Sequence, residues 1–465
     1  MSRAFAVFFL VIILFACDSK EDNLDLNFEG LKELDSDLII RSTADIDSFS
    51  LKKYQVVNGD VLINIASDSV LDLAGLNTIN CINGSLTVQN CPYLKELSGF
   101  DSLKVVTGNL TISENMSLSS LAGLSTLTFK VGDLMIYGNS TLQDLKGLEG
   151  IDSIQTVSII DNNQLEVIGD GMSFSHIEGS LEISGNTSLT NIRGFNRLRG
   201  KLPIVTVSNN PVLQSIVGFN YVKSVTDYIE IVNNSKLNLI DAFGFLKEVN
   251  ELFIKNNNEL SSLDGFDQVD VRIKSLNISD NPRLHTVSGF DNCPEISKLS
   301  FVSDSSLREV RGFSKLLILD HLILEKNMLR DITVFKHAAI SKSLVIKSCN
   351  QIQLLSRDTL SFISSDELAV KLINNDNLQD LSALSNLVEV GVLEIADNGK
   401  LSSLGGLEQL EEVAASHSFE RNKLLVDFCA LTYWVEEDDV KKLKTQGSKY
   451  QVGVLEMEEG KCLAK

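Results

Sequence analysis

The chain is 465 residues long, and 43% of its residues are hydrophobic, a share typical of folded proteins rather than disordered ones. Its 62 acidic and 41 basic residues give a formal net charge of −21. Because a strongly acidic surface repels phosphate backbones, this charge argues against a nucleic-acid partner. It favours either simple solubility or attraction of cations and basic proteins.

The N-terminal segment has the pattern of an export signal. Met1-Ser2-Arg3 carries a positive charge and precedes the apolar run 4–15, which is too short to span a bilayer comfortably. The run ends in Leu14-Phe15-Ala16-Cys17, which resembles the lipobox of bacterial lipoproteins, whose cysteine is acylated and becomes the first mature residue. The resemblance implies a lipoprotein signal peptide over residues 1–16 and lipidation of Cys17. The alternative is a conventional cleaved signal with an incidental cysteine.

Residues 17–27 are expected to form an acidic tether. Their stretch Asp18-Ser19-Lys20-Glu21-Asp22-Asn23 is polar and offers no apolar anchor, so it predicts a disordered link between the membrane and a folded body. Acidic residues directly after a lipidated cysteine also resemble surface-export signals of Bacteroidetes lipoproteins. We therefore expect an exported protein, lipid-anchored in the outer membrane at the cell surface, with a periplasm-facing location as the open alternative.

A unit of about 24 residues recurs over residues 28–428. In a plain copy, the apolar Leu110 and Ile112 flank the polar Thr111. Side chains two apart in a strand share a face, so Leu110 and Ile112 belong to a core while Thr111 points outward. The first apolar position of the pair runs from Leu38 in the first copy to Phe419 in the last. The pattern predicts one half-buried strand in each repeat.

An asparagine lies three residues after the second apolar position in most copies. Its amide can satisfy backbone groups of the turn that leaves the strand, and stacked copies predict a buried ladder. The ladder residues are Asn115, Asn139, Asn162, Asn186, Asn210, Asn234, Asn257, Asn281, Asn327, Asn375, Asn398 and Asn422. Cys91, Asp304 and Cys349 occupy the same position in other copies.

Two glycine positions mark the turns. One precedes the strand, as at Gly108, and is replaced by Asp227, Asn250 or Asp320 in other copies, so we expect left-handed backbone there. The other precedes an aromatic or aliphatic residue, as in Gly265-Phe266, and is expected to turn the chain so that the Phe enters the core.

No segment between the strands shows an extended 3.6-residue apolar period, which leaves little room for a helix in each repeat. The predicted fold class is therefore mainly β, a right-handed parallel β-solenoid of about 16–17 coils with an asparagine ladder and capped ends. Phe28, Leu31 and Leu34 precede the first strand and are expected to cover the N-terminal end of the core.

The repeat resembles that of receptor L domains. The resemblance rests on residues 106–112 followed by Asn115 and Leu118, and on residues 54–63 as the start of the first full coil. The same pattern is similar to leucine-rich-repeat-like solenoid lipoproteins of Bacteroidetes type. The resemblance covers about residues 37–465 and implies a cell-surface role, in most members the binding of a protein or a glycan.

Residues 429–465 are expected to form a C-terminal cap, with a short helix at 436–444 and a strand at 450–454. The run 427–431 with a late cysteine is similar to the cap of related Bacteroidetes proteins, and this resemblance implies a Cys429–Cys462 disulfide. Cys91, Cys293 and Cys349 sit at inward positions and are expected to be buried thiols. A Cys81–Cys91 bridge is the alternative for that pair.

No catalytic motif, zinc-site spacing or phosphate loop is present, so we expect no enzyme, no cofactor and no metal site. The enzymatic rival is a parallel β-helix polysaccharide lyase or hydrolase, which needs carboxylates that converge from adjacent coils. The outward position after each strand carries Glu114, Gly138 and Asp161 in three successive copies, so acids do not adjoin there.

Outward strand positions are the candidate binding surface. Most are polar, but Met135, Tyr137, Phe253, Ile323 and Val345 are apolar or aromatic, which can mark an interaction patch. The alternative is that segments 330–343 and 352–368 cover them. The function expected is a non-enzymatic envelope lipoprotein that recognises an extracellular protein or glycan through the solenoid face. A structural envelope protein without a discrete ligand is the competing interpretation.

Overall fold

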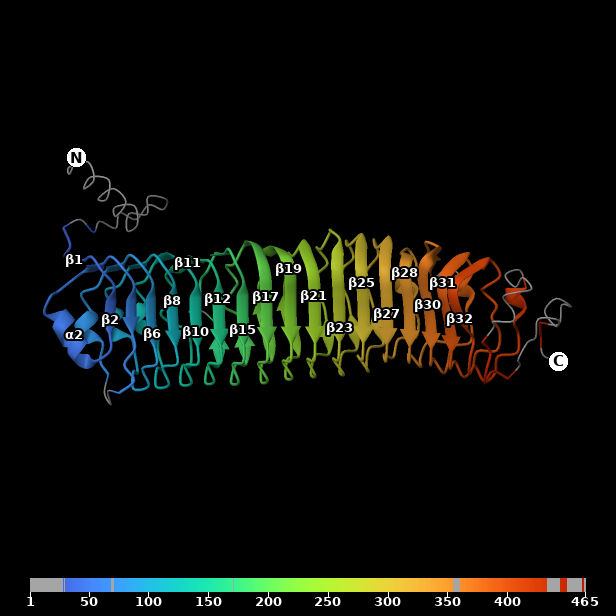
Figure 1. Ribbon diagram of the computed structural model, residues 1–465, viewed down its shortest axis with the longest axis horizontal. Helices are drawn as coiled ribbons and strands as arrows, with labels where there is room; N and C mark the ends of the chain where they lie inside the picture. The colour runs from blue at the N-terminus through green and yellow to red at the C-terminus, as the bar shows by residue number, and fades with distance from the viewer. Residues whose placement is uncertain are drawn as a thin grey trace, which may run out of the picture. The chain divides into compact units, whose positions relative to one another are not determined.

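The structure, a computed structural model, describes residues 28, 30–67, 71–169, 171–353, 360–432, 444–449 and 462–463. It comprises two units, Met1–Val225 and Thr226–Lys465, each built from stacked parallel strands (Figure 1). The chain is mainly β, as predicted, and forms a parallel β-solenoid of about 16 turns. The expected signal peptide, the tether with Cys17, and nearly all of the expected C-terminal helix and strand lie outside the described residues.

Unit 1 has one main sheet and three short ones. Its main-sheet strands are β2 (Leu38–Ile40), β4 (Val61–Ile63), β6 (Leu86–Gln89), β8 (Leu110–Ser113), β10 (Leu134–Tyr137), β12 (Val157–Ile160), β15 (Leu181–Ser184) and β17 (Gly200–Ser208). The shorter strands are β1 (Glu33–Leu34), β3 (Val56–Val57), β5 (Cys81–Ile82), β7 (Val105–Val106), β9 (Phe129–Val131), β11 (Ile151–Ile154), β13 (Val167–Ile168), β14 (His176–Ile177), β16 (Asn191–Ile192) and β18 (Ser215–Gly218). Strand β19 (Val222–Val232) contains the boundary between the units.

Unit 2 repeats this plan with longer main strands. These are β21 (Glu248–Lys255), β23 (Ile273–Ser279), β25 (Glu295–Val302), β27 (Ile318–Glu325), β28 (Ala339–Lys347), β30 (Ser365–Ile373), β31 (Glu389–Ala396) and β32 (Glu412–Ser418). The short strands are β20 (Leu239–Ala242), β22 (Ser262–Leu263), β24 (Thr286–Val287), β26 (Glu309–Val310) and β29 (Ser361–Phe362). Three-residue 3₁₀ turns occur in both units: η1 (Ala74–Leu76), η2 (Ser98–Phe100) and η3 (Ala122–Leu124) in unit 1, and η4 (Thr333–Phe335), η5 (Ser382–Leu384) and η6 (Cys429–Leu431) in unit 2.

The strands stack in register, so each inward position lies beside its equivalent in the next coil. Leu134 pairs with Leu110 on one side and Val157 on the other, and all three are fully buried. Ile112 and Ile136 are paired and buried in the same way. The core predicted from the two apolar positions is therefore present, and the residue between them is left to face outward.

The amide ladder in unit 1 joins five buried asparagines, from Asn115 to Asn210. The backbone N–H of each of the first four donates to the Oδ1 of the next asparagine at 3.0–3.1 Å, as from Asn139 to Asn162. Each Nδ2 donates to a strand carbonyl of the preceding coil, as from Asn162 to Ile136 at 2.9 Å. The row thus satisfies backbone groups that water does not reach.

The ladder in unit 2 consists of two rows. One runs from Asn234 through Asn257 and Asn281 to Asp304. The other begins at Cys349 and continues through the asparagines to Asn422. Asn327, predicted as a member, does not follow the pattern, because its Oδ1 accepts the Leu329 N–H of its own turn at 3.3 Å.

A stack of aromatic rings in unit 2 is formed by one phenylalanine from each of four successive coils: Phe243, Phe266, Phe290 and Phe313. Phe266 lies 5.9 Å from Phe243 and 5.3 Å from Phe290, and Phe313 continues the stack. The glycine before Phe266 has positive φ, as expected, but so does Phe266 itself, at 61°. A left-handed backbone costs a phenylalanine about 1–2 kcal/mol. Full burial of the ring returns about 1.5–3 kcal/mol, so the strained turn is tolerated.

The expectation of left-handed backbone before each strand was wrong. Gly108, Asp227, Asn250 and Asp320 are absent from the positive-φ residues of the described chain. Glycine is needed there because neighbouring coils approach closely: a Cβ at Gly108 would lie 2.7 Å from the backbone of Gly84. The left-handed position instead follows the strand, where the series that includes Glu114 lies.

Both the last coil and the N-terminal end differ from expectation. Leu393 pairs with His417, so Phe419 holds the second inward position and not the first. Asn422 lies three residues beyond Phe419, which is the ladder spacing of other coils, and a polar residue at the first position obscured the register.

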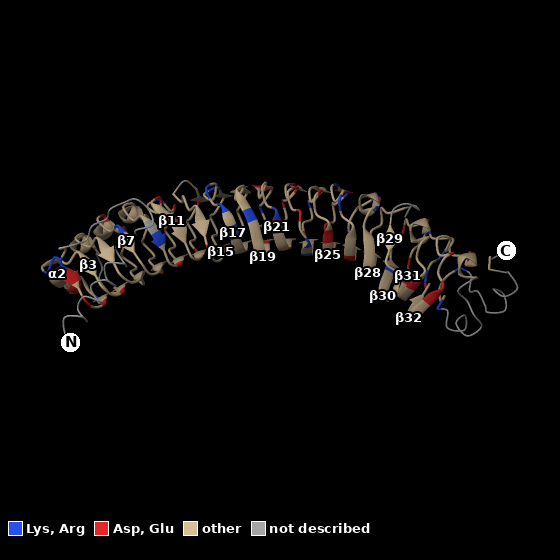
Figure 2. Cartoon of the chain, turned by 90° about the horizontal axis from the view of Figure 1, so that it is seen from above, with Lys and Arg blue, Asp and Glu red and all other residues tan. Residues whose placement is uncertain are grey.

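At the N-terminal end, helix α2 (Thr43–Ser50) was not predicted (Figures 1 and 2).

Helix α2 covers the first coil of unit 1. Its residues Ile46 and Phe49 are buried, whereas Phe28, Leu31 and Leu34 are only half-buried. Ser42 and Asp45 form a capping box, in which each side chain accepts the other residue's backbone N–H. That spacing is a sequence signal for a helix start.

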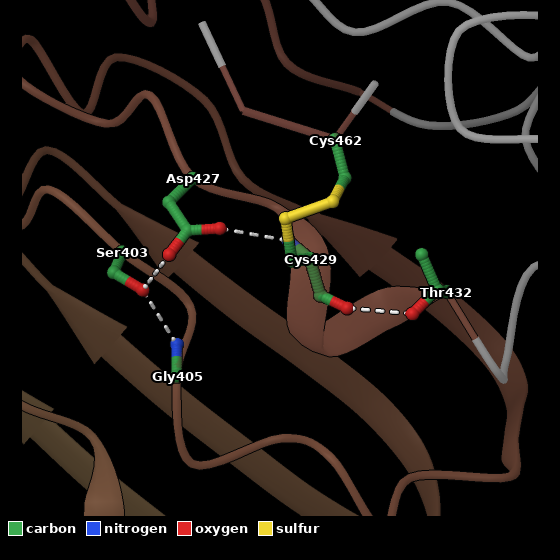
Figure 3. Close-up of a disulfide and its surroundings, with 6 residues drawn as sticks. All are labelled: Ser403, Gly405, Asp427, Cys429, Thr432 and Cys462. Atoms are coloured by element: carbon green, nitrogen blue, oxygen red, sulfur yellow. Dashed lines mark hydrogen bonds between the residues drawn. A yellow bond between two sulfur atoms is a disulfide. The ribbon is translucent and has the colours of Figure 1, made fainter. Parts of the chain in front are cut away.

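The disulfide implied by the cap resemblance is present. Cys429 and Cys462 are bonded, and their Cα atoms are 4.8 Å apart (Figure 3). The Phe428 N–H donates to the Cys462 carbonyl at 3.0 Å, and Asp427 Oδ1 accepts the Cys429 N–H at 3.0 Å. Cys91, Cys293 and Cys349 are buried free thiols, so Cys91 does not pair with Cys81.

We expect Asn162→Ala to lower the free energy of unfolding of unit 1 by about 2–4 kcal/mol, because the Ile136 carbonyl and the Asn139 N–H both lose buried partners. Urea unfolding followed by circular dichroism measures the change. Asn163→Ala, at the exposed neighbouring position, is the control and should stay within about 0.5 kcal/mol. Equal effects of the two variants would contradict a stabilising role for the ladder amide.

We expect the double variant Cys429→Ser/Cys462→Ser to loosen the C-terminal end of unit 2. The bridge joins residues separated by 33 positions, and a loop of that size is worth roughly 3–4 kcal/mol by the chain-entropy argument. Native-state hydrogen exchange should show lost protection at the amides of Phe428 and Leu431. The amide of Leu134 in unit 1 is the internal control and should keep its protection.

Candidate binding surface

The outward strand face is the surface formed by main-sheet side chains that point away from the core. Because neighbouring strands pair in parallel and in register, equivalent outward side chains lie side by side about 4.8 Å apart. Figure 2 marks the basic and acidic residues along the strands, seen from above.

In unit 1 the predicted residues Met135 and Tyr137 share strand β10. Met135 is 42% exposed and lies between Thr111 and Ser158 of the neighbouring strands. Tyr137 is half-buried, and its hydroxyl donates to Glu114 Oε1 at 3.1 Å. This hydrogen bond, with some burial and the Glu114 charge, raises the pKa of Tyr137. The two side chains form a small patch whose polar end is already bonded.

In unit 2 the predicted residues Ile323 and Val345 are brought together. They are direct partners on β27 and β28 and are both half-buried. We call them the aliphatic pair. Two adjacent β-branched side chains on a paired strand surface have restricted rotamers. Little of their side-chain entropy is therefore lost when a partner covers them.

Phe253 does not join the aliphatic pair. In the same row, Asn277 and Ser300 separate it from Ile323. Its ring instead packs edge-on against Tyr228, with ring centroids 6.5 Å apart, and Lys255 Nζ lies 4.9 Å from the ring centroid. Tyr228 and Phe253 form an aromatic pair, of which only Phe253 was predicted from the sequence. The available signal was that Tyr228 directly precedes the inward Ile229, which places Tyr228 on the outward face.

Charges on the outward face of unit 2 are largely paired between strands. Lys274 lies 2.6 Å from Glu251, and Lys347 lies 3.5 Å from Glu325. Exposed pairs of this kind contribute at most about 1 kcal/mol each to stability. Their larger effect is to neutralise the face around the aromatic and aliphatic pairs.

Under the alternative interpretation, segment 330–343 would cover the apolar side chains of the outward strand face. It contains η4 and the beginning of β28, with Phe335 buried in the core, so it forms part of a regular coil. Segment 352–368 likewise supplies β29 and the start of β30, except for residues 354–359, which lie outside the described residues. In the described part, both segments are components of the stack.

Two polar groups bear on the enzymatic alternative. His321 Nδ1 lies 2.8 Å from Ser343 Oγ on the outward face. Burial, then the charge of Lys342, lowers the pKa of His321. On the Gly-Phe turns, burial and then the charges of Asp291 and Asp264 raise the pKa of Asp267. His321 lies on a main-sheet strand and Asp267 on a turn, so these two groups are not combined in one constellation.

Residues 53–170 match the family model of the Receptor L domain. This match lies within unit 1, and the match and the stacked parallel strands together fit a receptor L-domain-like solenoid. The family is a non-enzymatic type of binding domain. A comparison with curated proteins gave no match.

The described residues contain no helix with the length and apolar character needed to cross a membrane. They also contain no cluster of three or more His, Cys, Asp or Glu side chains arranged to hold a metal ion.

Proposed function

We propose that this protein is a non-enzymatic cell-envelope lipoprotein that binds an extracellular protein or glycan through its outward strand face. The receptor L-domain-like fold supports a binding or structural module. The observation that carries the finer proposal is the aliphatic pair, Ile323 with Val345, held on adjacent strands of a rigid, in-register sheet. Half-exposed apolar side chains with no role in the core are expected where a partner binds.

The composition of the face fits a partner that is neutral or mixed in charge. The aromatic pair presents a ring surface for stacking on a sugar or an apolar side chain, and Lys255 lies beside it. The cross-strand ion pairs leave little net charge to repel a ligand. The competing proposal, a structural envelope protein, assigns no binding role to these exposed side chains.

The mature domain, tested against a glycan array and by pull-down from envelope extracts, is expected to give a saturable partner at micromolar concentration or below. For that partner, Ile323→Ser/Val345→Ser should weaken affinity at least tenfold, about 1.4 kcal/mol, because two central apolar contacts are lost. Met116→Ser is the matched control, since Met116 is 61% exposed and lies on a turn. No saturable partner, or equal losses in both variants, would favour the structural role.

The lipid anchor is tested separately. We expect the wild-type chain to incorporate labelled fatty acid and to fractionate with the outer membrane, whereas Cys17→Ser releases it from the membrane fraction because the acylated thiol is gone. Cys91→Ser is the control and should remain anchored. Membrane retention of the Cys17→Ser chain would contradict the proposal, and surface protease accessibility distinguishes the cell surface from the periplasm.

A further inference from the structure

Asp304 replaces an amide at the end of the first ladder row of unit 2. In the two rungs before it, the amide Nδ2 donates to a strand carbonyl of the preceding coil: Asn257 to Ile231 at 2.9 Å and Asn281 to Ile254 at 3.0 Å. Ile254 pairs with Ile278 in the next coil. By this repeat, the carbonyl that the rung at position 304 must satisfy is that of Ile278.

One oxygen of Asp304 takes the normal ladder role. Its Oδ1 accepts the Asn281 N–H at 2.9 Å and the Asn281 Nδ2 at 3.1 Å. The other oxygen, Oδ2, replaces the amide nitrogen and has no partner among the described residues. The side chain is fully buried, so bulk solvent does not reach it. An ionised carboxylate only accepts hydrogen bonds, and at this position it would oppose a carbonyl that also only accepts.

The next rung of the ladder, Asn327, supplies no hydrogen bond to the Oδ2 of Asp304. Asn327 gives its Oδ1 to Leu329 of its own turn, and its Nδ2 has no partner in the described chain. The unpartnered Oδ2 and Nδ2 therefore belong to consecutive rungs, where the two rows of unit 2 are interrupted. Unsatisfied buried polar groups in a native fold call for a specific explanation.

Nearby charges do not favour ionisation. Burial raises the pKa of Asp304 to about 7, and the negative charge of Asp280 on the adjoining turn acts in the same direction. The hydrogen bonds from Asn281 oppose this shift only in part. On the following coil, Lys326 lies at the surface, where its Nζ is 3.7 Å from Glu325.

We propose that Asp304 is a proton-binding rung: as the neutral acid it donates its Oδ2 hydrogen to the Ile278 carbonyl, and loss of that proton to solvent loosens the stack between β23 and β25, the two strands that this hydrogen bond joins. The neutral acid reproduces the donor that asparagine supplies elsewhere in the row. The ionised form lacks it.

The direction of the pH effect follows from proton linkage. The folded-state pKa lies above the unfolded value near 3.8, so between about pH 4 and pH 7 the folded chain holds a proton that the unfolded chain has released. The stabilisation from Asp304 is complete below pH 4 and is lost as the pH rises through about 7. Above that value it no longer changes.

The test compares wild type with Asp304→Asn by native-state hydrogen exchange of amides in β23 and β25 between pH 5 and pH 8. At each pH the ratio of the two rates is used, so that the intrinsic chemistry of exchange cancels. From pH 5 to pH 7 the protection of wild type relative to the Asp304→Asn variant should fall by about two orders of magnitude, since each pH unit below the folded-state pKa corresponds to a tenfold change. From pH 7 to pH 8 the ratio should stay nearly constant. A ratio independent of pH would overturn the proposal.

Two further variants test whether the pH dependence is specific to an acid in the ladder. Asp280→Asn removes the adjoining exposed acid and should retain most of the wild-type pH dependence. Asn257→Asp places a second acid in an uninterrupted part of the row and should add a new loss of protection in β19 and β21 as the pH rises, because Asn257 bonds to the Ile231 carbonyl. The infrared band of a protonated carboxylic acid, present in wild type at pH 6 and absent from Asp304→Asn, reports the proton directly, and its absence from wild type would also overturn the proposal.

Discussion

The stack depends on one constraint: backbone groups that turn away from a buried strand must find hydrogen-bond partners without water. Asparagine meets this constraint because a single side chain carries both donors and an acceptor. In unit 1, Asn162 joins the Asn139 N–H to the Ile136 carbonyl, and the adjacent rungs repeat the arrangement. Other residues enter the row where they reproduce part of this bonding. Cys91 accepts the Ile65 N–H at 3.3 Å, and one oxygen of Asp304 continues the ladder.

Positions that build the fold can be distinguished from positions that are free to vary. Inward leucines, ladder amides and turn glycines are tied to neighbouring coils, because an altered volume or a lost hydrogen bond is felt in the next repeat. On the outward strand face, neighbouring coils are joined by exposed ion pairs such as Lys274 with Glu251 and by the ring contact of Tyr228 with Phe253. Under the proposed function, the aromatic pair and the aliphatic pair of unit 2 are the partner contacts.

Local pattern was sufficient where a position has one dominant requirement. The spacing of Leu110, Ile112 and Asn115 predicted the strand, the core face and the ladder, since period-two alternation and a regularly repeated amide offset leave few alternatives. It was insufficient where neighbours decide the outcome. Gly108 looks like a conformational glycine, yet the backbone of Gly84 is what excludes a side chain there. His417 concealed the register of the last coil.

Three features follow from the residues alone, because each is encoded within a single repeat: the chain repeats, it coils around stacked apolar pairs, and its turns need buried amides. Which outward residues meet depends instead on how the coils pack. Ile323 contacts its partner Val345 while Phe253 turns to Tyr228, since cross-strand neighbours are separated by a whole coil in sequence. The packing of the coils also decides that Asn327 leaves the ladder next to Asp304, because hydrogen-bond partners depend on two coils at once.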